Sequence, residues 1–205
     1  MTHPTTADAY DDLAPQWQDD AFNPTNGIAQ HERALTFLSD QTGGWALNVG
    51  CGCNTRFNGL LREHNLRLEG VDVSARMLAL AREADPLVEL HHADVTEWEP
   101  PRAYRFISAW DSVWHVPLER QRALMLKLMA ALAPGGVLLF TAGGLDAPAE
   151  HVDAPMGPAL YYATLGIPAL LEVLADGQCV CRHLEFDQWP EKHLVVIAQR
   201  VRSTA

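Results

Sequence analysis

The sequence predicts an α/β fold around a mostly parallel β-sheet. From Trp45 onward, short apolar runs alternate with helical patterns, as in repeated βαβ units. The first of these runs leads into Gly50 and Gly52 and then into a helical pattern, a junction typical of such folds. Only residues 187–192 separate the last two strand candidates. This connection is too short for a helical crossover, so the two strands should pair antiparallel.

The length of 205 residues suits one domain, which we divide into three parts. Residues 1–44 should form two helices, over Ala7–Gln18 and Ile28–Ser39, joined by turn residues. Residues 45–142 should form the alternating core. Residues 143–205 should form a long loop, a helix and the final antiparallel strand pair.

The core should contain five strands with helices between most of them. Ser74 is a good N-cap for a helix over Ala75–Ala84, and apolar residues repeat at helical spacing along Leu118–Leu132. Pro100 and Pro101 leave room for only a minimal helix between the third and fourth strands. The expected strands are Trp45–Val49, Leu68–Val73, Leu87–His91, Arg105–Trp110 and Val137–Ala142.

The pattern changes after Ala142. The stretch Gly143–Pro158 has no clear period, so we expect a long loop there, of the kind that is usually functional or disordered. A helix over Leu165–Ala175 should follow it. The chain should then end in the strands Cys179–Phe186 and His193–Val201.

Composition and charge narrow the possible functions. Apolar residues make up 48% of the chain, whereas 26 acidic against 15 basic residues give a formal net charge of -11. This charge disfavours binding to nucleic acids or anionic membranes. The longest apolar stretch, Ala123–Ala133, is too short to span a bilayer, and the N-terminus lacks a signal-peptide pattern. We therefore expect a cytoplasmic protein with reduced thiols.

The four cysteines form two C-x-C pairs, at positions 51 and 53 and at positions 179 and 181. A zinc site of four thiolates usually uses C-x2-C spacing, and here one pair lies in a turn while the other fits a strand. We therefore expect no metal site. His91 and His92 are interpreted as surface residues at a strand end.

The strand and glycine turn over Leu47–Phe57 carry the strongest functional signal. Glycines let the backbone turn tightly and approach a ligand without a β-carbon in the way. Asp72 ends the next strand, where a carboxylate can accept hydrogen bonds from both ribose hydroxyls of a nucleoside. By itself Asp72 also fits a helix cap, but the two features together predict a nucleotide-type ligand.

In these motifs the chain resembles the class I S-adenosylmethionine-dependent methyltransferases, and the resemblance covers nearly the whole chain. Asn48-Val49-Gly50-Cys51-Gly52 is similar to the glycine motif of this family. Asp72 is similar to its ribose-binding acid, and Asp94 to the acid that contacts the adenine amino group. Residues 106–111 resemble its fourth strand, and residues 132–138, with a Pro-Gly-Gly turn, resemble its entry into the fifth.

The resemblance implies a Rossmann-like, doubly wound sheet of seven strands, mostly parallel with an antiparallel C-terminal strand. It also implies S-adenosyl-L-methionine as the cofactor and transfer of its methyl group by in-line displacement, for which most of the rate gain comes from holding donor and acceptor in place. The cofactor-binding residues implied are Tyr10, Trp17, Asn48, Gly50, Cys51, Gly52, Asp72, Val73, Met77, Asp94, Val95 and Trp110.

Two departures from the family pattern stand in the glycine motif. Asn48 replaces a common acid, which should weaken the contact to the cofactor's ammonium group while keeping hydrogen-bonding capacity. Asn54 and Thr55 replace a usual third glycine, and Asn54 tolerates left-handed backbone geometry. A nicotinamide-dependent dehydrogenase is a rival interpretation, disfavoured by Thr55 and by the antiparallel ending. A protein that binds the cofactor without catalysis is another.

His115 and Asp111 are the candidate catalytic residues. Both follow the fourth strand, and ligands of open α/β sheets bind at the carboxyl ends of strands. A histidine suits the removal of a proton from a hydroxyl or amine acceptor. The alternatives are a structural role for His115 in the loop before Pro117 and a turn-capping role for Asp111.

Aromatic residues should flank these candidates. Trp110 is expected to face the ligand, whereas Trp114 fits a core anchor slightly better. Tyr10 and Trp17 lie in a segment that resembles the family's N-terminal lid, where aromatic faces exclude water and favour a sulfonium. Ordinary helix packing is the alternative for both.

The acceptor is expected to be a small molecule. The resemblance leaves only the N-terminal helices and residues 143–162 to enclose it, with no separate domain to dock a macromolecule. Against nucleic acid stand the net charge of -11 and the absence of an Asn-Pro-Pro-Tyr-like motif at residues 110–114.

Overall fold

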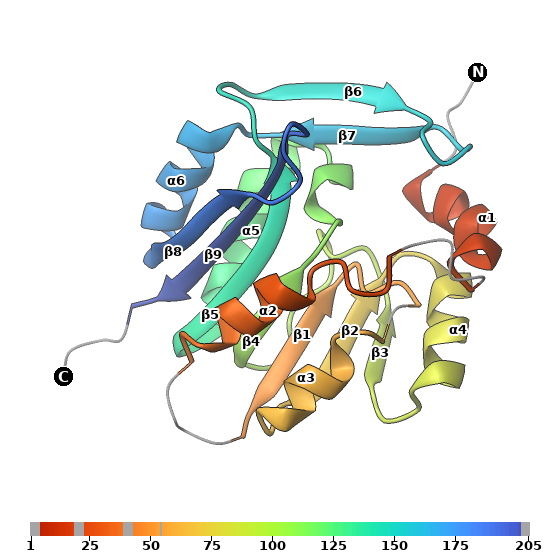
Figure 1. The fold of residues 1–205 in the computed structure, drawn as a ribbon, viewed down its shortest axis with the longest axis horizontal. Helices are drawn as coiled ribbons and strands as arrows, with labels where there is room; N and C mark the ends of the chain where they lie inside the picture. Colours follow the sequence, from red (N-terminus) through yellow and green to blue (C-terminus); the bar gives the residue numbers. More distant parts are fainter. Residues whose placement is uncertain (1–4, 19–22, 39–42, 54, 202–205) are drawn as a thin grey trace.

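The computed structural model describes residues 5–18, 23–38, 43–53 and 55–201. Its centre is a seven-stranded sheet in the order β3-β2-β1-β4-β5-β9-β8 (Figure 1). Neighbouring strands are parallel except at β9, which runs antiparallel to β5 and β8, so the predicted fold class is confirmed. The strands are β1 Trp45–Val49, β2 Arg67–Asp72, β3 Glu89–His92, β4 Tyr104–Ala109, β5 Leu132–Gly143, β8 Cys179–Phe186 and β9 His193–Arg200.

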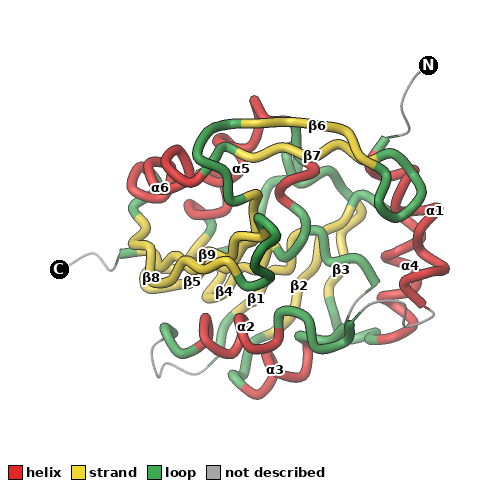
Figure 2. Tube along the Cα trace, turned by 45° about the horizontal axis from the view of Figure 1, so that its top comes forward, coloured by secondary structure: helices red, strands yellow, loops and turns green. Residues whose placement is uncertain are grey.

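Helices cover both faces of this sheet (Figure 2). Helices α2 and α3 pack on one face and α5 and α6 on the other, while α4 packs against β2 and β3. The helices are α1 Thr6–Gln18, α2 Ile28–Leu35, α3 Asn58–Glu63, α4 Ala75–Ala84, α5 Leu118–Ala130 and α6 Ile167–Asp176, with a 3-10 turn η1 Val113–His115. Within the described residues, no helix has the length and apolarity needed to cross a membrane.

Strand β5 separates the two cores. Successive side chains of a strand point to opposite faces of the sheet. Leu138 and Phe140 belong to the core under α5 and α6, whereas Val137 and Leu139 belong to the core under α2 and α3. The continuous apolar run of β5 therefore reflects burial on both faces.

Strand β5 begins at Leu132 rather than at Val137. The Pro-Gly-Gly turn lies inside the strand, next to a register irregularity in its pairing with β4. A β-carbon at Gly136 would come within 2.9 Å of the carbonyl oxygens of Ala133 and Tyr104. Glycine therefore lets two backbone segments approach closely at this point.

The predicted loop over Gly143–Pro158 is wrong in its middle. Strand β6, Ala149–Asp153, pairs antiparallel with β7, Leu160–Thr164, in a hairpin separate from the main sheet. The side chains of β6 are all at least partly exposed, so its sequence carries no apolar alternation. Leu160 of β7 is buried against Ala9 and Leu13 of α1, and the hairpin and α1 lie at the same end of the sheet (Figure 1).

Smaller differences concern element ends. Helix α2 ends at Leu35; the predicted end, Ser39, lies outside the described residues, as does Asn54. Only turns connect β3 to β4, without the minimal helix expected. The predicted N-cap is confirmed, because the Ser74 hydroxyl accepts a hydrogen bond from the Met77 N–H at 3.0 Å.

His31 joins α2 to β4 in the core. Its side chain is fully buried, stacked on the ring of Phe57 at a centroid distance of 3.6 Å. Nδ1 lies 2.7 Å from the carbonyl oxygen of Gly27 and Nε2 lies 2.8 Å from the Ser108 hydroxyl. Because the carbonyl can only accept, Nδ1 donates, and Nε2 accepts from Ser108. Burial lowers the pKa of His31 to about 3, so the ring is neutral.

Candidate active site

A cavity of about 1450 Å³ lies at the carboxyl ends of β1 to β4, walled by α1 and β7. Sites for one small ligand usually measure roughly 300–1,000 Å³, so this cavity has room for a nucleoside-sized ligand and a second small molecule. It is lined by all the candidate cofactor-binding and catalytic residues, namely Tyr10, Trp17, Asn48, Gly50, Cys51, Gly52, Asp72, Val73, Met77, Asp94, Val95, Trp110, Asp111 and His115.

The glycine turn brings the backbone to the cavity wall. Gly50 and Gly52 have φ values of 63° and 55°, in the left-handed region that favours glycine. The N–H groups of Gly50 and Cys51 both donate to the carbonyl of Val71, at 2.9 and 3.2 Å. A β-carbon at Gly50 would overlap the Cβ of Ser112, in the loop after β4. The loops after β1 and β4 therefore meet at this glycine.

Asp72 braces the glycine turn from β2. Its Oδ2 accepts a hydrogen bond from the Gly52 N–H and its Oδ1 from the Ser74 N–H, both at 2.8 Å. Burial raises the pKa of the Asp72 carboxyl against the effect of these hydrogen bonds. Ser74, not Asp72, provides the side-chain cap of α4. Each carboxylate oxygen retains a lone pair for a ligand.

Helix α1 is docked over the cavity by polar and apolar contacts. Asp11 Oδ1 accepts from the Ser74 hydroxyl at 2.5 Å and from the Arg76 N–H at 3.1 Å. The rings of Tyr10 and Trp17 meet edge to face, with centroids 6.2 Å apart. The side of α1 that carries Tyr10 thus forms part of the cavity wall.

His115 is held by three hydrogen bonds. Nε2 lies 3.1 Å from Trp114 Nε1, which is a donor only, so Nε2 carries the lone pair. The Tyr10 hydroxyl also reaches Nε2, at 2.8 Å, while Nδ1–H donates to the Tyr161 carbonyl at 2.9 Å. Burial lowers the pKa of His115 to about 4, although the Tyr161 hydrogen bond and the charge of Asp111 oppose this. The imidazole is therefore neutral, and the lone pair of Nε2 faces both the Tyr10 hydroxyl and the Trp114 N–H.

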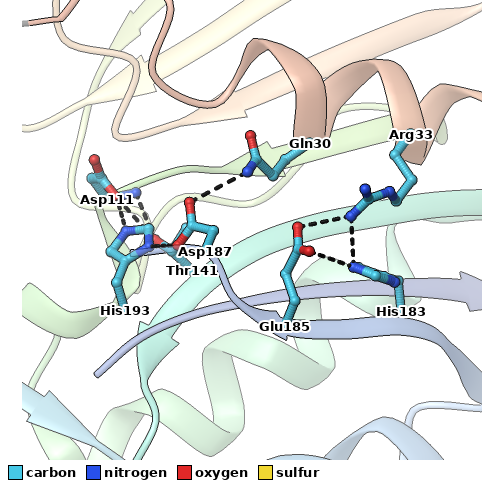
Figure 3. Close-up of polar contacts among 8 residues, drawn as sticks. All are labelled: Gln30, Arg33, Asp111, Thr141, His183, Glu185, Asp187 and His193. Carbon is cyan, nitrogen blue, oxygen red and sulfur yellow. Dashed lines mark hydrogen bonds and ion pairs between the residues drawn. The ribbon is translucent and has the colours of Figure 1, made fainter. Parts of the chain in front are cut away.

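Asp111 belongs to a polar cluster that sequence reasoning did not find (Figure 3). Its φ is 53°, and its N–H donates to Thr141 Oγ1 at 2.8 Å. The Thr141 hydroxyl returns a hydrogen bond to Oδ1 at 3.2 Å, and His193 Nε2 donates to the same oxygen at 2.9 Å. His193 Nδ1 contacts Asp187 Oδ1 at 2.5 Å, and Gln30 donates to Oδ2 of Asp187 at 3.4 Å.

His193 is an imidazolium in this arrangement, because both ring nitrogens face carboxylate oxygens. Burial acts to lower the pKa of His193, but the hydrogen bonds to Asp111 and Asp187 outweigh it and raise the pKa. The predicted antiparallel ending contained a signal for this residue. Antiparallel pairing places the start of the last strand at the carboxyl end of β5, where the site lies.

Both tryptophans line the cavity, Trp110 as expected and Trp114 in place of the expected core position. Trp110 is only 5% exposed, and its indole packs on Gly27 and His31 within the core, although it also reaches the cavity. Trp114 lines the cavity and is less buried. Trp110 Nε1 and Ser112 Oγ are buried without a hydrogen-bond partner among the described residues. Buried polar atoms in a cavity wall are candidates to bind a ligand.

Within the described residues, one group of acidic and histidine side chains comes within metal-ligand distance, namely Glu69, Glu89 and His91. Arg102 already pairs with both carboxylates, at 3.2 and 2.9 Å, and His91 Nε2 lies 2.7 Å from Glu69. This group is an ion-pair network, and His91 is more than a surface residue. His92 is exposed, as predicted, and also borders the cavity. The four cysteines are free.

Comparison with known proteins agrees with this geometry. Residues 46–136 match the family model of a methyltransferase domain. Solved methyltransferases share the fold over nearly the whole chain. The sugar N-methyltransferase KedS8 from a Streptoalloteichus species superposes with a TM-score of 0.71 at 15% identity, covering 98% of this chain and 96% of that one.

Residues 46–136 thus match a methyltransferase domain, and the chain as a whole shares the fold of solved S-adenosylmethionine-dependent methyltransferases. A second solved structure with this fold is the 1,6-didemethyltoxoflavin-N1-methyltransferase of Burkholderia thailandensis, with a TM-score of 0.68 at 18% identity. The match covers 94% of this chain and 84% of that one. The trans-aconitate 2-methyltransferase of Paracidovorax citrulli is 38% identical over 95 residues, 45% of this chain. The chain spans only 36% of the length of that relative.

Proposed function

We propose that the protein transfers a methyl group from S-adenosyl-L-methionine to a small-molecule acceptor. The observation that carries this proposal is that one cavity brings Gly50, Asp72 and Asp94 together with His115 and a set of aromatic side chains. The match of residues 46–136 to a methyltransferase domain and the methyltransferase names of the relatives support the same reaction type.

The residues present fit the cofactor. Asp72 offers an oxygen to each ribose hydroxyl, Asp94 borders the cavity after β3, and the turn at Gly50 leaves the backbone accessible. The buried Trp110 Nε1 and Ser112 Oγ provide polar groups that a ligand would satisfy. When bound, the cofactor supplies an electrophilic methyl group on its sulfonium.

Tyr10 and His115 would remove the acceptor's proton. The Tyr10 oxygen takes a proton from an acceptor hydroxyl or amine while its own proton moves to His115 Nε2, 2.8 Å away. Burial raises the pKa of Tyr10, with Tyr162, Asp111 and Asp72 adding to the effect, so its hydroxyl relays a proton and does not persist as a phenolate. The rings of Trp114 and Tyr162 line the cavity and exclude water.

Calorimetry should detect binding of S-adenosylmethionine and S-adenosylhomocysteine, and Asp72→Ala should weaken both. Charge-assisted hydrogen bonds contribute about 1.5 to 3 kcal/mol, which corresponds to a loss of about 10- to 150-fold in affinity. Asp176→Ala, which removes an exposed carboxylate paired with Arg122, is the matched control and should leave affinity unchanged. If the wild type binds a nicotinamide dinucleotide and neither of the two sulfur compounds, the proposal is wrong.

Methyl transfer should be detected with small molecules and not with bulk nucleic acid or protein. Residues of α1 and β7 wall the cavity on two sides, and a concave site of this kind suits a small molecule. A screen with radiolabelled cofactor would test small amines, alcohols and carboxylic acids, including trans-aconitate, beside DNA, RNA and protein. Label confined to the macromolecular fractions would contradict a small-molecule acceptor.

A further inference from the structure

Asp111 presents a fixed carboxylate to the cavity. The hydrogen bonds from Thr141 and His193 both reach Oδ1, while Asp111 lines the cavity and its side chain is 37% exposed (Figure 3). Asp187 holds the far side of the His193 ring and is itself only 6% exposed. Neighbouring side chains thus fix one oxygen of Asp111, and the carboxylate retains capacity for a ligand.

Asp111 and Asp72 approach the glycine turn from different strands. Asp72 contacts the turn at Gly52, whereas Ser112, the neighbour of Asp111, meets it at Gly50. The Tyr10 phenol experiences the charges of both carboxylates. A nucleoside bound through its ribose at Asp72 would therefore extend across the turn toward Asp111.

The surroundings of Asp111 complement a zwitterion. Arg56 lines the same cavity and interacts electrostatically with Asp111, so a cation and an anion stand near one another. Trp110 Nε1 and Ser112 Oγ, on the residues either side of Asp111, are buried donors without a protein partner among the described residues. An α-amino acid group carries one ammonium and one carboxylate, and these side chains offer one acceptor for the first and several donors for the second.

We propose that Asp111 binds the ammonium group at the α-amino acid end of the cofactor and that His193, backed by Asp187, is the residue that positions Asp111 for it. The inference rests on the proposed function, since S-adenosylmethionine ends in such a group. It gives the site an anion at the end of β4, whereas Asn48 at the end of β1 is neutral. It also assigns Asp111 to cofactor binding and leaves proton removal to Tyr10 and His115.

The test compares two ligands that differ in the amino acid end. S-adenosylhomocysteine carries it, and 5′-methylthioadenosine lacks it while keeping the nucleoside and the sulfur. In calorimetry, Asp111→Asn should weaken binding of S-adenosylhomocysteine about 10-fold or more and change binding of 5′-methylthioadenosine less than about twofold. Asp72→Ala should weaken both ligands, because it acts on the ribose that they share.

His193→Gln tests the positioning role and also serves if Asp111→Asn fails to fold. Glutamine can still donate to Asp111, but it carries no charge and cannot bridge to Asp187, so S-adenosylhomocysteine should bind about 3- to 10-fold more weakly with 5′-methylthioadenosine unaffected. His183→Gln, in the separate cluster with Arg33 and Glu185, is the matched control and should change neither affinity (Figure 3).

The outcomes separate the two proposals. If the wild type binds neither ligand, the proposed function is overturned and this inference with it. Binding of both ligands, with Asp111→Asn and His193→Gln leaving the ratio of the two affinities unchanged, overturns this inference alone.

Discussion

Replacing His115 with alanine is expected to lower turnover by about 100- to 10,000-fold, the range typical of losing a general base. The structure shows a neutral imidazole whose Nε2 lone pair faces the Tyr10 hydroxyl at 2.8 Å. Removal of the ring leaves Tyr10 without a proton acceptor. The measurement is the steady-state rate with an acceptor found by the screen, together with the affinity for S-adenosylhomocysteine, which should change less than about threefold.

Tyr10→Phe is the companion variant for this prediction. It keeps the ring that packs edge to face on Trp17 and removes only the hydroxyl that reaches His115. Turnover should again fall while cofactor affinity is retained. Should His115→Ala reduce stability and cofactor binding in step, with turnover per bound cofactor intact, the histidine is a structural residue of the loop before Pro117.

Acidification from pH 6.5 to pH 4.5 is expected to destabilise the fold through His31. An unfolded histidine titrates near pH 6.5, whereas burial lowers the pKa of His31 to about 3 in the folded chain. The unfolded state therefore takes up a proton that the folded state refuses. Stability conferred by the neutral ring is present above pH 6.5 and is lost as the pH falls, by about 2 to 3 kcal/mol at pH 4.5.

Two other histidines affect the dependence of stability on pH. Burial also lowers the pKa of His115, to about 4, so it adds to the loss in the same window. The pKa of His193 is raised, so its stabilising effect is complete below pH 6.5 and disappears only as the pH rises through the folded value. Urea unfolding at half-unit pH steps gives the free energy of unfolding at each pH. Between pH 6.5 and pH 4.5 this free energy should fall less steeply for His31→Gln than for the wild type. Equal slopes would contradict the assignment.

The sheet was predictable because its signals are local. Each core strand is a short apolar run, and Gly50, Gly52 and Ser74 mark the turns and caps beside them. The β6–β7 hairpin was not predictable in this way. Its outer strand buries no apolar face, and its inner strand depends on α1, which is distant in sequence. Tertiary packing, not strand propensity, determines this hairpin.

The candidate site likewise has one part that local sequence patterns predict and another that depends on tertiary contacts. Asp72 and the glycines follow a spacing that a single stretch of chain displays, whereas the Asp111–His193 contact joins residues 82 positions apart and the His31–Ser108 contact residues 77 apart. No local pattern marks such pairs. The environments of Trp110 and Trp114 also depended on packing, because Gly27 of another element provides the surface on which Trp110 lies.

In the proposed function, the cavity wall on the acceptor side comes from α1 and β7, which lie outside the matched segment 46–136 on either side of it. Acceptor selectivity and donor binding would then be carried by different parts of the chain. Exchanges in Met156 or Tyr162 would reshape the space for the acceptor while the turn at Gly50 stays intact. Tyr10 is the exception, because it stands in the α1 wall yet reaches His115 after β4. Replacing α1 by the corresponding helix of a solved methyltransferase with this fold would therefore change the acceptor wall and part of the proposed proton path together.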